Sequence, residues 1–94
     1  ARGLPGRARV SYNLGVLLDF LQKDVEAEAA LGKALAIAPD NADYLTALTQ
    51  FYLKRGRLRE AQPLAQRLIQ SHPNHPAAAR MKAFIEQEQA KQKE

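Results

Sequence analysis

Apolar residues recur along this chain three and four positions apart, the spacing that gives a helix one apolar face. The first stripe consists of Val10, Leu14, Leu17, Leu18 and Leu21. The second consists of Ala27, Ala30, Leu31, Ala34, Leu35 and Ala38. Pro39 then prevents that helix from continuing. No segment shows the period of two that marks a half-buried strand, so the pattern predicts an all-α fold.

Two further stripes follow with the same spacing. The third consists of Tyr44, Leu45, Leu48, Phe51 and Tyr52, and the fourth of Leu58, Ala61, Leu64, Ala65, Leu68 and Ile69. Gly56 separates these two helices and Pro73 ends the second of them. Pro63 lies inside the fourth helix and removes one backbone hydrogen bond there, so we expect a mild bend and no break.

The last predicted helix covers residues 76–89 and carries a sparser stripe of Ala78, Met81 and Ile85. Its opposite face is polar, so this helix can cap the apolar side of the hairpin before it. We expect the polar residues 90–94 to fray and residues 1–7, which glycine and proline interrupt, to form a flexible segment.

The chain repeats itself with the spacing that separates Pro39 from Pro73. At that shift other identical or similar residues coincide: Ala27 with Ala61, Leu14 with Leu48, Leu18 with Tyr52, and Leu35 with Ile69. Ala30 and Leu31 become Leu64 and Ala65, a swap that conserves volume, as a packed interface tolerates best. We therefore divide the chain into repeat 1 (residues 8–41), repeat 2 (residues 42–75) and the capping helix.

The composition fits one small globular domain, with 46% apolar and 26% charged residues among 94. The chain lacks cysteine, which excludes disulfides, a thiol nucleophile and thiolate metal ligands. No apolar run is long enough to span a membrane. The first residue is Ala1 and no signal segment follows it, so we expect an excised or processed piece of a longer protein.

The net charge of +4 has one dense source, the turn that carries Lys54, Arg55, Arg57 and Arg59. Such a turn could hold a phosphate or an acidic partner segment, or it could be a solvated turn whose cations suit a helix C-terminus. Aromatic residues are not interleaved with these cations, as stacking on nucleic acid bases would require, so nucleic acid is not the expected partner.

The remaining polar residues do not form a site for chemistry. His72 and His75 flank a turn without a third metal ligand, and Asp19, Asp40 and Asp43 suit capping and surface roles. Neither Ser11 nor Ser71 has a motif around it. We expect no enzymatic activity, no metal and no cofactor.

These features resemble the tetratricopeptide repeat family, whose pattern is W-x2-L-G-x2-Y, then A-x3-F, then P, on a period of about 34 residues. In repeat 1 the matches are Leu14, Gly15, Ala27 and Pro39, while Ser11, Leu18 and Leu31 replace the three aromatic residues. In repeat 2 the matches are Leu48, Tyr52, Ala61 and Pro73, while Leu45, Thr49 and Ala65 depart from the pattern. The resemblance implies a right-handed α–α superhelix of about five antiparallel helices.

The resemblance also implies a protein-interaction scaffold that binds a peptide or a partner protein on its concave face, which the first helix of each repeat lines. The residues it places there are Arg9, Tyr12, Val16, Asp19, Phe20, Asp43, Thr46, Gln50, Leu53, Lys54, Ala77, Arg80 and Phe84. Family members that clamp the carboxylates of chaperone tails use cations on these helices. The matching positions here are Tyr12, Val16, Ala47, Ala77 and Met81, so we expect no such clamp.

An alternative role is a structural segment that docks on its own parent protein or on a second copy of itself. Two repeats and a cap fall short of the roughly three repeats that such stacks usually need, so an upstream part or a second chain could cover an open side. Similar repeats occur both in cytoplasmic scaffolds and in exported proteins, and the sequence favours neither compartment.

Overall fold

The computed structural model describes residues 5–92, which form five helices and no strand, as the pattern predicts. The helices are α1 (Pro5–Phe20), α2 (Asp24–Ile37), α3 (Ala42–Lys54), α4 (Leu58–Ser71) and α5 (Pro76–Gln92). The predicted flexible residues 1–4 and the end of the predicted frayed tail, residues 93–94, lie outside the described residues.

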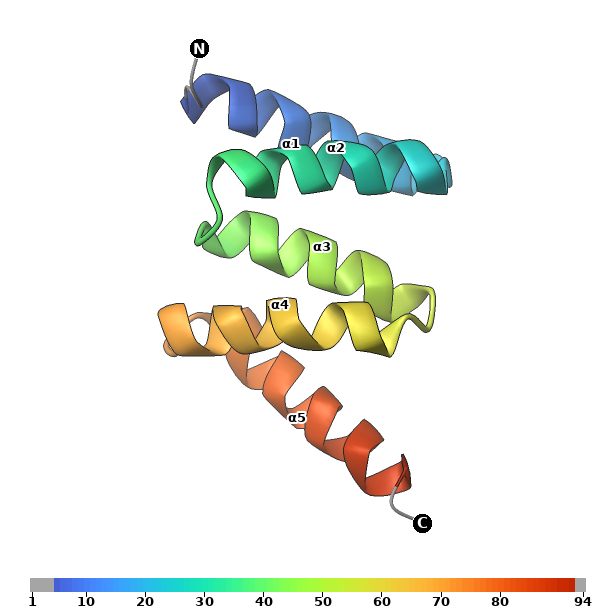
Figure 1. Ribbon diagram of the computed structural model, residues 1–94, viewed down its shortest axis with the longest axis vertical. Coiled ribbons are helices and arrows are strands. Elements are labelled where there is room, and N and C mark those ends of the chain that lie inside the picture. Colours follow the sequence, from blue (N-terminus) through green and yellow to red (C-terminus); the bar gives the residue numbers. More distant parts are fainter. Residues whose placement is uncertain (1–4, 93–94) are drawn as a thin grey trace.

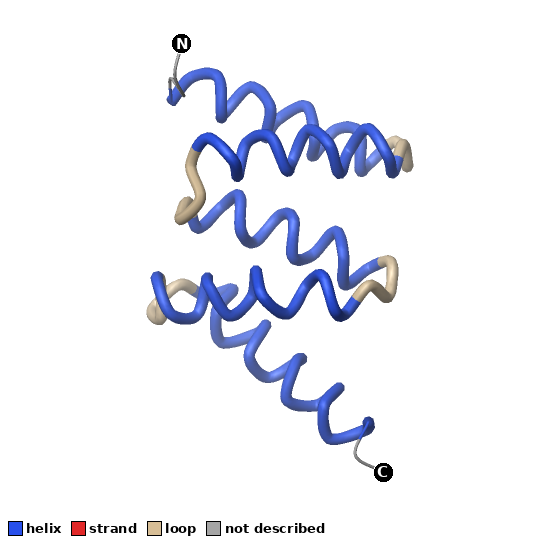
Figure 2. Tube along the Cα trace, in the orientation of Figure 1, coloured by secondary structure: helices blue, strands red, loops and turns tan. Residues whose placement is uncertain are grey.

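The helices form an elongated stack that measures 47 × 28 × 18 Å. Successive helices from α1 to α4 run antiparallel, and α5 crosses below α4 at a steeper angle (Figures 1 and 2). The closest pairs are α1 with α2 and α3 with α4, which are the two hairpins that the repeats predict. Helix α2 packs on α3 and joins the two hairpins, and α5 packs on α4 as the cap.

The turns within the two hairpins are built alike. In repeat 2, Gly56 adopts φ +72°, and the amide of Arg57 donates to the carbonyl of Tyr52 at 2.9 Å, which closes the end of α3. In repeat 1 the equivalent residue is Gln22, with φ +63°, and the amide of Lys23 donates to the carbonyl of Leu18 at 2.9 Å. The turn needs a residue with positive φ, which glycine adopts most easily. Repeat 1 has a glutamine there, and its left-handed backbone conformation costs conformational free energy.

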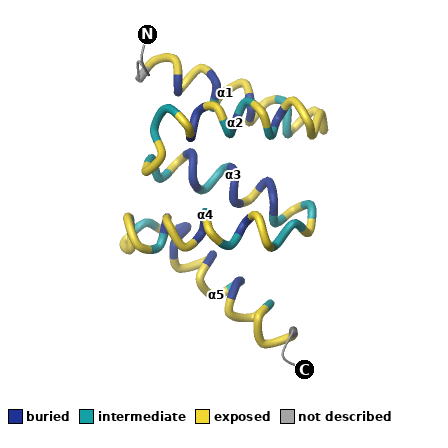
Figure 3. Tube along the Cα trace, in the orientation of Figure 1, coloured by how far each residue is buried: buried dark blue, intermediate teal, exposed yellow. Residues whose placement is uncertain are grey.

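The core is centred on α3, whose buried residues include Leu45, Leu48 and Phe51 (Figure 3). Leu31 of α2 and Leu68 of α4 pack into the same cluster, at 2% and 0% exposed. At its start, α3 is capped by Asn41, whose side chain accepts a hydrogen bond from the amide of Tyr44 at 3.2 Å. Repeat 2 therefore buries the stripe that its sequence predicts.

The first stripe lies on a helix, as its periodicity predicts, but most of it is exposed. Val10, Leu14, Leu17 and Leu21 are 49–66% exposed, and Leu18 is half-buried. Helix α1 instead turns its small residues Ala8, Ser11 and Gly15 toward α2. The physical reason is that Leu31 of α2 fills the space above Gly15, and only a face of small residues allows so close an approach.

Two helix boundaries differ from the expectation. Helix α1 begins at Pro5, three residues before the expected start of repeat 1, because proline suits the first position of a helix. Helix α5 continues to Gln92, past the expected end at residue 89, where Lys91 pairs with Glu88 at 3.4 Å. Helix α4 passes through Pro63 without a break, as predicted.

Candidate partner-binding face and inter-repeat ion pairs

The first helix of each repeat and the capping helix share one side of the stack, here called the inner face. A groove of about 290 Å³ lies on it between α1 and α3. Its lining is Tyr12, Val16, Asp19, Leu31, Asp43, Thr46, Ala47, Gln50 and Lys54. Seven of the residues that the resemblance places on the concave face are in this set. The groove is mainly polar, and Thr46 Oγ1 has no hydrogen-bond partner among the described residues.

A second groove, of about 240 Å³, lies between α3 and α5. It is lined by Gln50, Leu53, Ala77, Arg80, Met81 and Phe84, and most of its lining is apolar. Gln50 of α3 lines both grooves. Leu53 and Phe84 are half-buried, which leaves part of each side chain open to a ligand. The inner face thus combines a polar groove with an apolar one.

Two of the predicted concave residues, Arg9 and Phe20, line neither groove. The guanidinium of Arg9 lies 5.2 Å from the ring centre of Tyr12 and 5.6 Å from that of Tyr44, and it pairs with Asp43 at 3.8 Å. Phe20 is 81% exposed and borders a separate hollow at the end of α1, together with Lys54 and Arg55. The inner-face role of the predicted residues remains a prediction.

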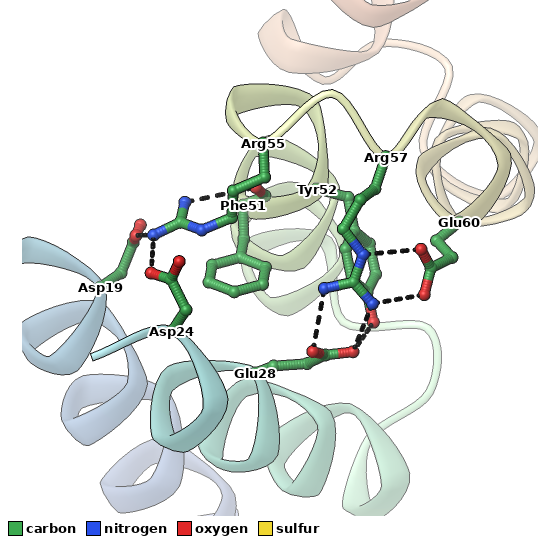
Figure 4. Close-up of polar contacts among 8 residues, drawn as sticks. All are labelled: Asp19, Asp24, Glu28, Phe51, Tyr52, Arg55, Arg57 and Glu60. Atoms are coloured by element: carbon green, nitrogen blue, oxygen red, sulfur yellow. Dashed lines mark hydrogen bonds and ion pairs between the residues drawn. The ribbon is translucent and has the colours of Figure 1, made fainter. Parts of the chain in front are cut away.

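The basic turn is engaged in ion pairs between the two repeats (Figure 4). Lys54 Nζ lies 2.7 Å from Asp19, and the guanidinium of Arg55 contacts Asp19 at 2.8 Å and also Asp24. That guanidinium also covers the ring of Phe51, 4.0 Å from its centre. The turn after α3 is therefore fastened to the turn after α1.

Arg57 forms the second half of the cluster. It contacts Glu28 of α2 at 3.1 Å and also Glu60 of its own helix start, and it lies 4.7 Å from the ring centre of Tyr52. The hydroxyl of Tyr52 donates to Glu28 at 2.7 Å. Arg59 alone among the four cations of the turn has no ion pair within residues 5–92. The contacts favour a structural role for the turn over a phosphate site, since carboxylates already occupy three of its cations.

Sequence reasoning had no means to identify the acidic partners of this cluster. Asp24, Glu28 and Glu60 are not themselves positions of the repeat pattern, although Glu28 and Glu60 lie next to the matching residues Ala27 and Ala61. Asp24 and Glu28 are separated from their arginine partners by 31 and 29 residues, and only the stacking of the hairpins brings them together, whereas Glu60 lies three residues from Arg57. The only sequence signal for these partners is that Asp24 and Glu60 lie in the first turns of α2 and α4. Acidic residues at such positions also suit the helix dipole, so this signal does not indicate ion pairs.

The cluster shifts the pKa values of its members. Hydrogen bonds from Arg57 and Tyr52 hold the pKa of Glu28 below its usual range, and those from Arg55 do the same for Asp24. Burial, followed by the hydrogen bond to Glu28, raises the pKa of Tyr52 from 10.0 to about 12. Folding favours the charged carboxylates and the neutral phenol of Tyr52. The stability of the fold therefore falls at both acidic and strongly alkaline pH.

We expect the contribution of Tyr52 to stability to be complete below pH 10 and to disappear as the pH rises towards 12, since its folded pKa is raised. The carboxylates have lowered pKa values, so their contribution is complete above about pH 4.5 and is lost as the pH falls further. Urea unfolding followed by circular dichroism between pH 3 and 11.5 measures both ends. Tyr52→Phe should flatten the alkaline end relative to Tyr12→Phe, and equal profiles for the two variants would contradict the assignment.

The other polar candidates serve the turns. His72 Nε2 contacts the carbonyl oxygen of Asp40, and His75 Nδ1 accepts a hydrogen bond from the amide of Ala77 at 3.0 Å, at the start of α5. Ser11 is buried against α2, and Ser71 is exposed at the end of α4. Within residues 5–92, no three histidine or acidic side chains gather as a metal site would require. None of the described helices combines the length and the apolar character needed to cross a membrane.

Two stacked helical hairpins related by one sequence period, with a capping helix, define a helical-repeat protein. A family model described as Tetratricopeptide repeat matches residues 22–85, more than half of the chain. The protein therefore belongs to the tetratricopeptide repeat family, as its motifs indicate. Repeats of this family generally mediate protein–protein interactions, and their typical role is that of a non-enzymatic scaffold.

Proposed function

We propose that this protein is a non-enzymatic interaction module that binds an extended segment of a partner protein along its inner face. The observation that carries the proposal is that two grooves flank α3, one toward α1 and one toward α5, and that Gln50 lines both. An amide side chain in such a position can donate and accept hydrogen bonds to a peptide backbone. Family membership supports a protein partner, and the grooves suggest where it lies.

The two grooves favour different parts of a ligand. The groove between α3 and α5 offers Leu53, Met81 and Phe84, which suit one large apolar side chain. Arg80 borders that groove and makes no ion pair within the described residues, so an acidic residue beside the apolar one would complement it. The polar groove between α1 and α3 suits backbone and polar groups. The proposed ligand is thus a segment with an acidic and a large apolar residue side by side.

Selection from a displayed peptide library tests this proposal. We expect the selected peptides to share the acidic–apolar pair, and Phe84→Ala to weaken their binding by about tenfold or more, as for an anchor residue. Arg80→Glu should reverse the charge preference of the selection. Arg67→Ala is the matched control, because Arg67 is exposed on α4 and lines neither groove.

Fluorescence anisotropy with the selected peptides provides the affinities, and circular dichroism shows that each variant folds. Selected peptides without a common pattern, or equal losses for Phe84→Ala and Arg67→Ala, would contradict the proposal. The alternative, a segment that docks on other parts of its parent protein, is favoured by a different surface, the exposed side of α1.

A further inference from the structure

The large apolar side chains that stand exposed are gathered at one end of the stack. In the described part of the chain all seven of them lie between Val10 and Val25: Val10, Leu14, Val16, Leu17, Phe20, Leu21 and Val25. Four of these follow the first stripe: Val10, Leu14 and Leu17 on α1, and Leu21 in the turn just after it. This stripe and the adjoining side of α2 are here called the N-terminal edge. The opposite end of the stack, on α5, exposes no large apolar residue within the range described.

The N-terminal edge is grooved as well as apolar. A hollow of about 340 Å³ runs between α1 and α2, lined by Ser11, Leu14, Leu18, Glu26, Ala29, Ala30 and Lys33. Alanines on α2 leave room for a further helix to approach closely. An apolar strip beside such a hollow is typical of an interface and unusual for a solvated surface.

The molecule itself contains a second copy of this surface, one repeat further along. At the shift of one repeat, Val10, Leu14 and Leu17 correspond to Tyr44, Leu48 and Phe51. These three residues of α3 are only 4%, 5% and 0% exposed. Helix α2, the second helix of the preceding hairpin, packs on α3. In repeat 2 the preceding hairpin thus covers this surface, with α2 packed on α3 and the ring of Tyr12 of α1 beside that of Tyr44.

The proline period gives an independent indication. Pro39 and Pro73 each stand two residues after the end of the second helix of a repeat. Pro5 precedes Pro39 by the same interval by which Pro39 precedes Pro73, so it falls on the same position of the repeat. By sequence register, Pro5 therefore marks the boundary of one more repeat, although in the structure Pro5 is already the first residue of α1 and not a turn residue like Pro39 and Pro73.

We propose that the N-terminal edge binds a further helical hairpin of the same polypeptide, one repeat in length, which packs its second helix on α1 as α2 packs on α3. The occupant presents an amphipathic helix with an apolar face of the α2 kind. This edge is separate from the inner face, so the inference stands independently of the proposed ligand site. It also explains why α1 keeps a stripe of large apolar residues on the side away from α2.

A chain in which residues 8–41 occur twice in tandem tests the proposal. The inner copy of α1 then has a hairpin before it, whereas the outer copy keeps its exposed edge. We expect Leu17→Asp in the inner copy to lower the melting temperature by about 10 °C or more, as for a buried leucine. The same change in the outer copy should shift it by less than about 2 °C, as at an exposed site. If the inner Leu17→Asp chain does not fold, inner and outer Leu17→Ala provide the same comparison.

Val25→Asp is the control for charge, because Val25 is 84% exposed and its equivalent Arg59 is exposed too. It should have a small effect in both copies. Small, equal effects of Leu17→Asp in the two copies would overturn the proposal. Sedimentation of the 94-residue chain is the second measurement: a dimer that Leu17→Asp dissociates would assign the edge to a second copy and also overturn it, whereas a monomer supports it.

Discussion

Phe51→Ala is expected to lower the free energy of unfolding by about 3–5 kcal/mol, a large part of the stability of a small domain. Phe51 is 0% exposed at the centre of the core, and its ring contacts both Tyr52 and the guanidinium of Arg55. Truncation leaves a cavity that α2, α3 and α4 can only partly fill, because all three helices are fixed by their turns. It also removes the aromatic surface on which Arg55 rests while it pairs with Asp19 and Asp24.

Phe20→Ala is the matched control for this substitution. Phe20 is 81% exposed, so the same loss of atoms should change the free energy of unfolding by no more than about 0.5 kcal/mol. Urea unfolding followed by circular dichroism at 222 nm measures both variants. Similar losses for the two phenylalanines would mean that the core is not centred on α3.

The helices and their order follow from the sequence because periodicity and proline act locally. Pro39 and Pro73 end helices whatever surrounds them, and a helical period of apolar residues needs no knowledge of the partner. Because the two repeats have apolar residues at equivalent positions, their hairpins are expected to stack on each other. For these reasons five helices and the family could be predicted.

The orientation of α1 could not be predicted in the same way. Its periodicity marks Leu14 and Leu17 as one apolar face but does not say which helix covers that face. In repeat 2 the same face is buried by the preceding hairpin, and α1 has none before it within the described residues. The contact with α2 is made by small residues, whose pattern is weaker than that of leucines.

The two candidate sites also differ in how far the sequence predicts them. Residues of the inner face follow from their place in the repeat, so the lining of the two grooves overlaps the predicted set. The partners of the basic turn depend on side chains that meet only after the hairpins stack, such as Arg55 with Asp19, 36 residues apart. The order of residues in the sequence carries no information on such distant pairs. The sequence therefore left open a cationic site at the basic turn that is free to bind an anion.

Gly15→Ala and Gly32→Ala should change stability in opposite directions, although both glycines lie inside helices. A Cβ atom on Gly15 would lie 2.6 Å from Cγ of Leu31 and 3.0 Å from its backbone nitrogen. Leu31 is 2% exposed and cannot move aside, so α1 and α2 must separate. We expect a net loss of about 1–3 kcal/mol from the overpacking.

A Cβ atom on Gly32 meets no atom within 4 Å. Gly32→Ala therefore gains helix propensity without a clash and should raise the free energy of unfolding by about 0.5–1 kcal/mol. Thermal unfolding of the two variants beside the parent chain measures the contrast. A gain at both positions would mean that α1 does not approach α2 through Gly15, and the exposed stripe of α1 would then lose its physical explanation, because a helix free to rotate would bury its leucines.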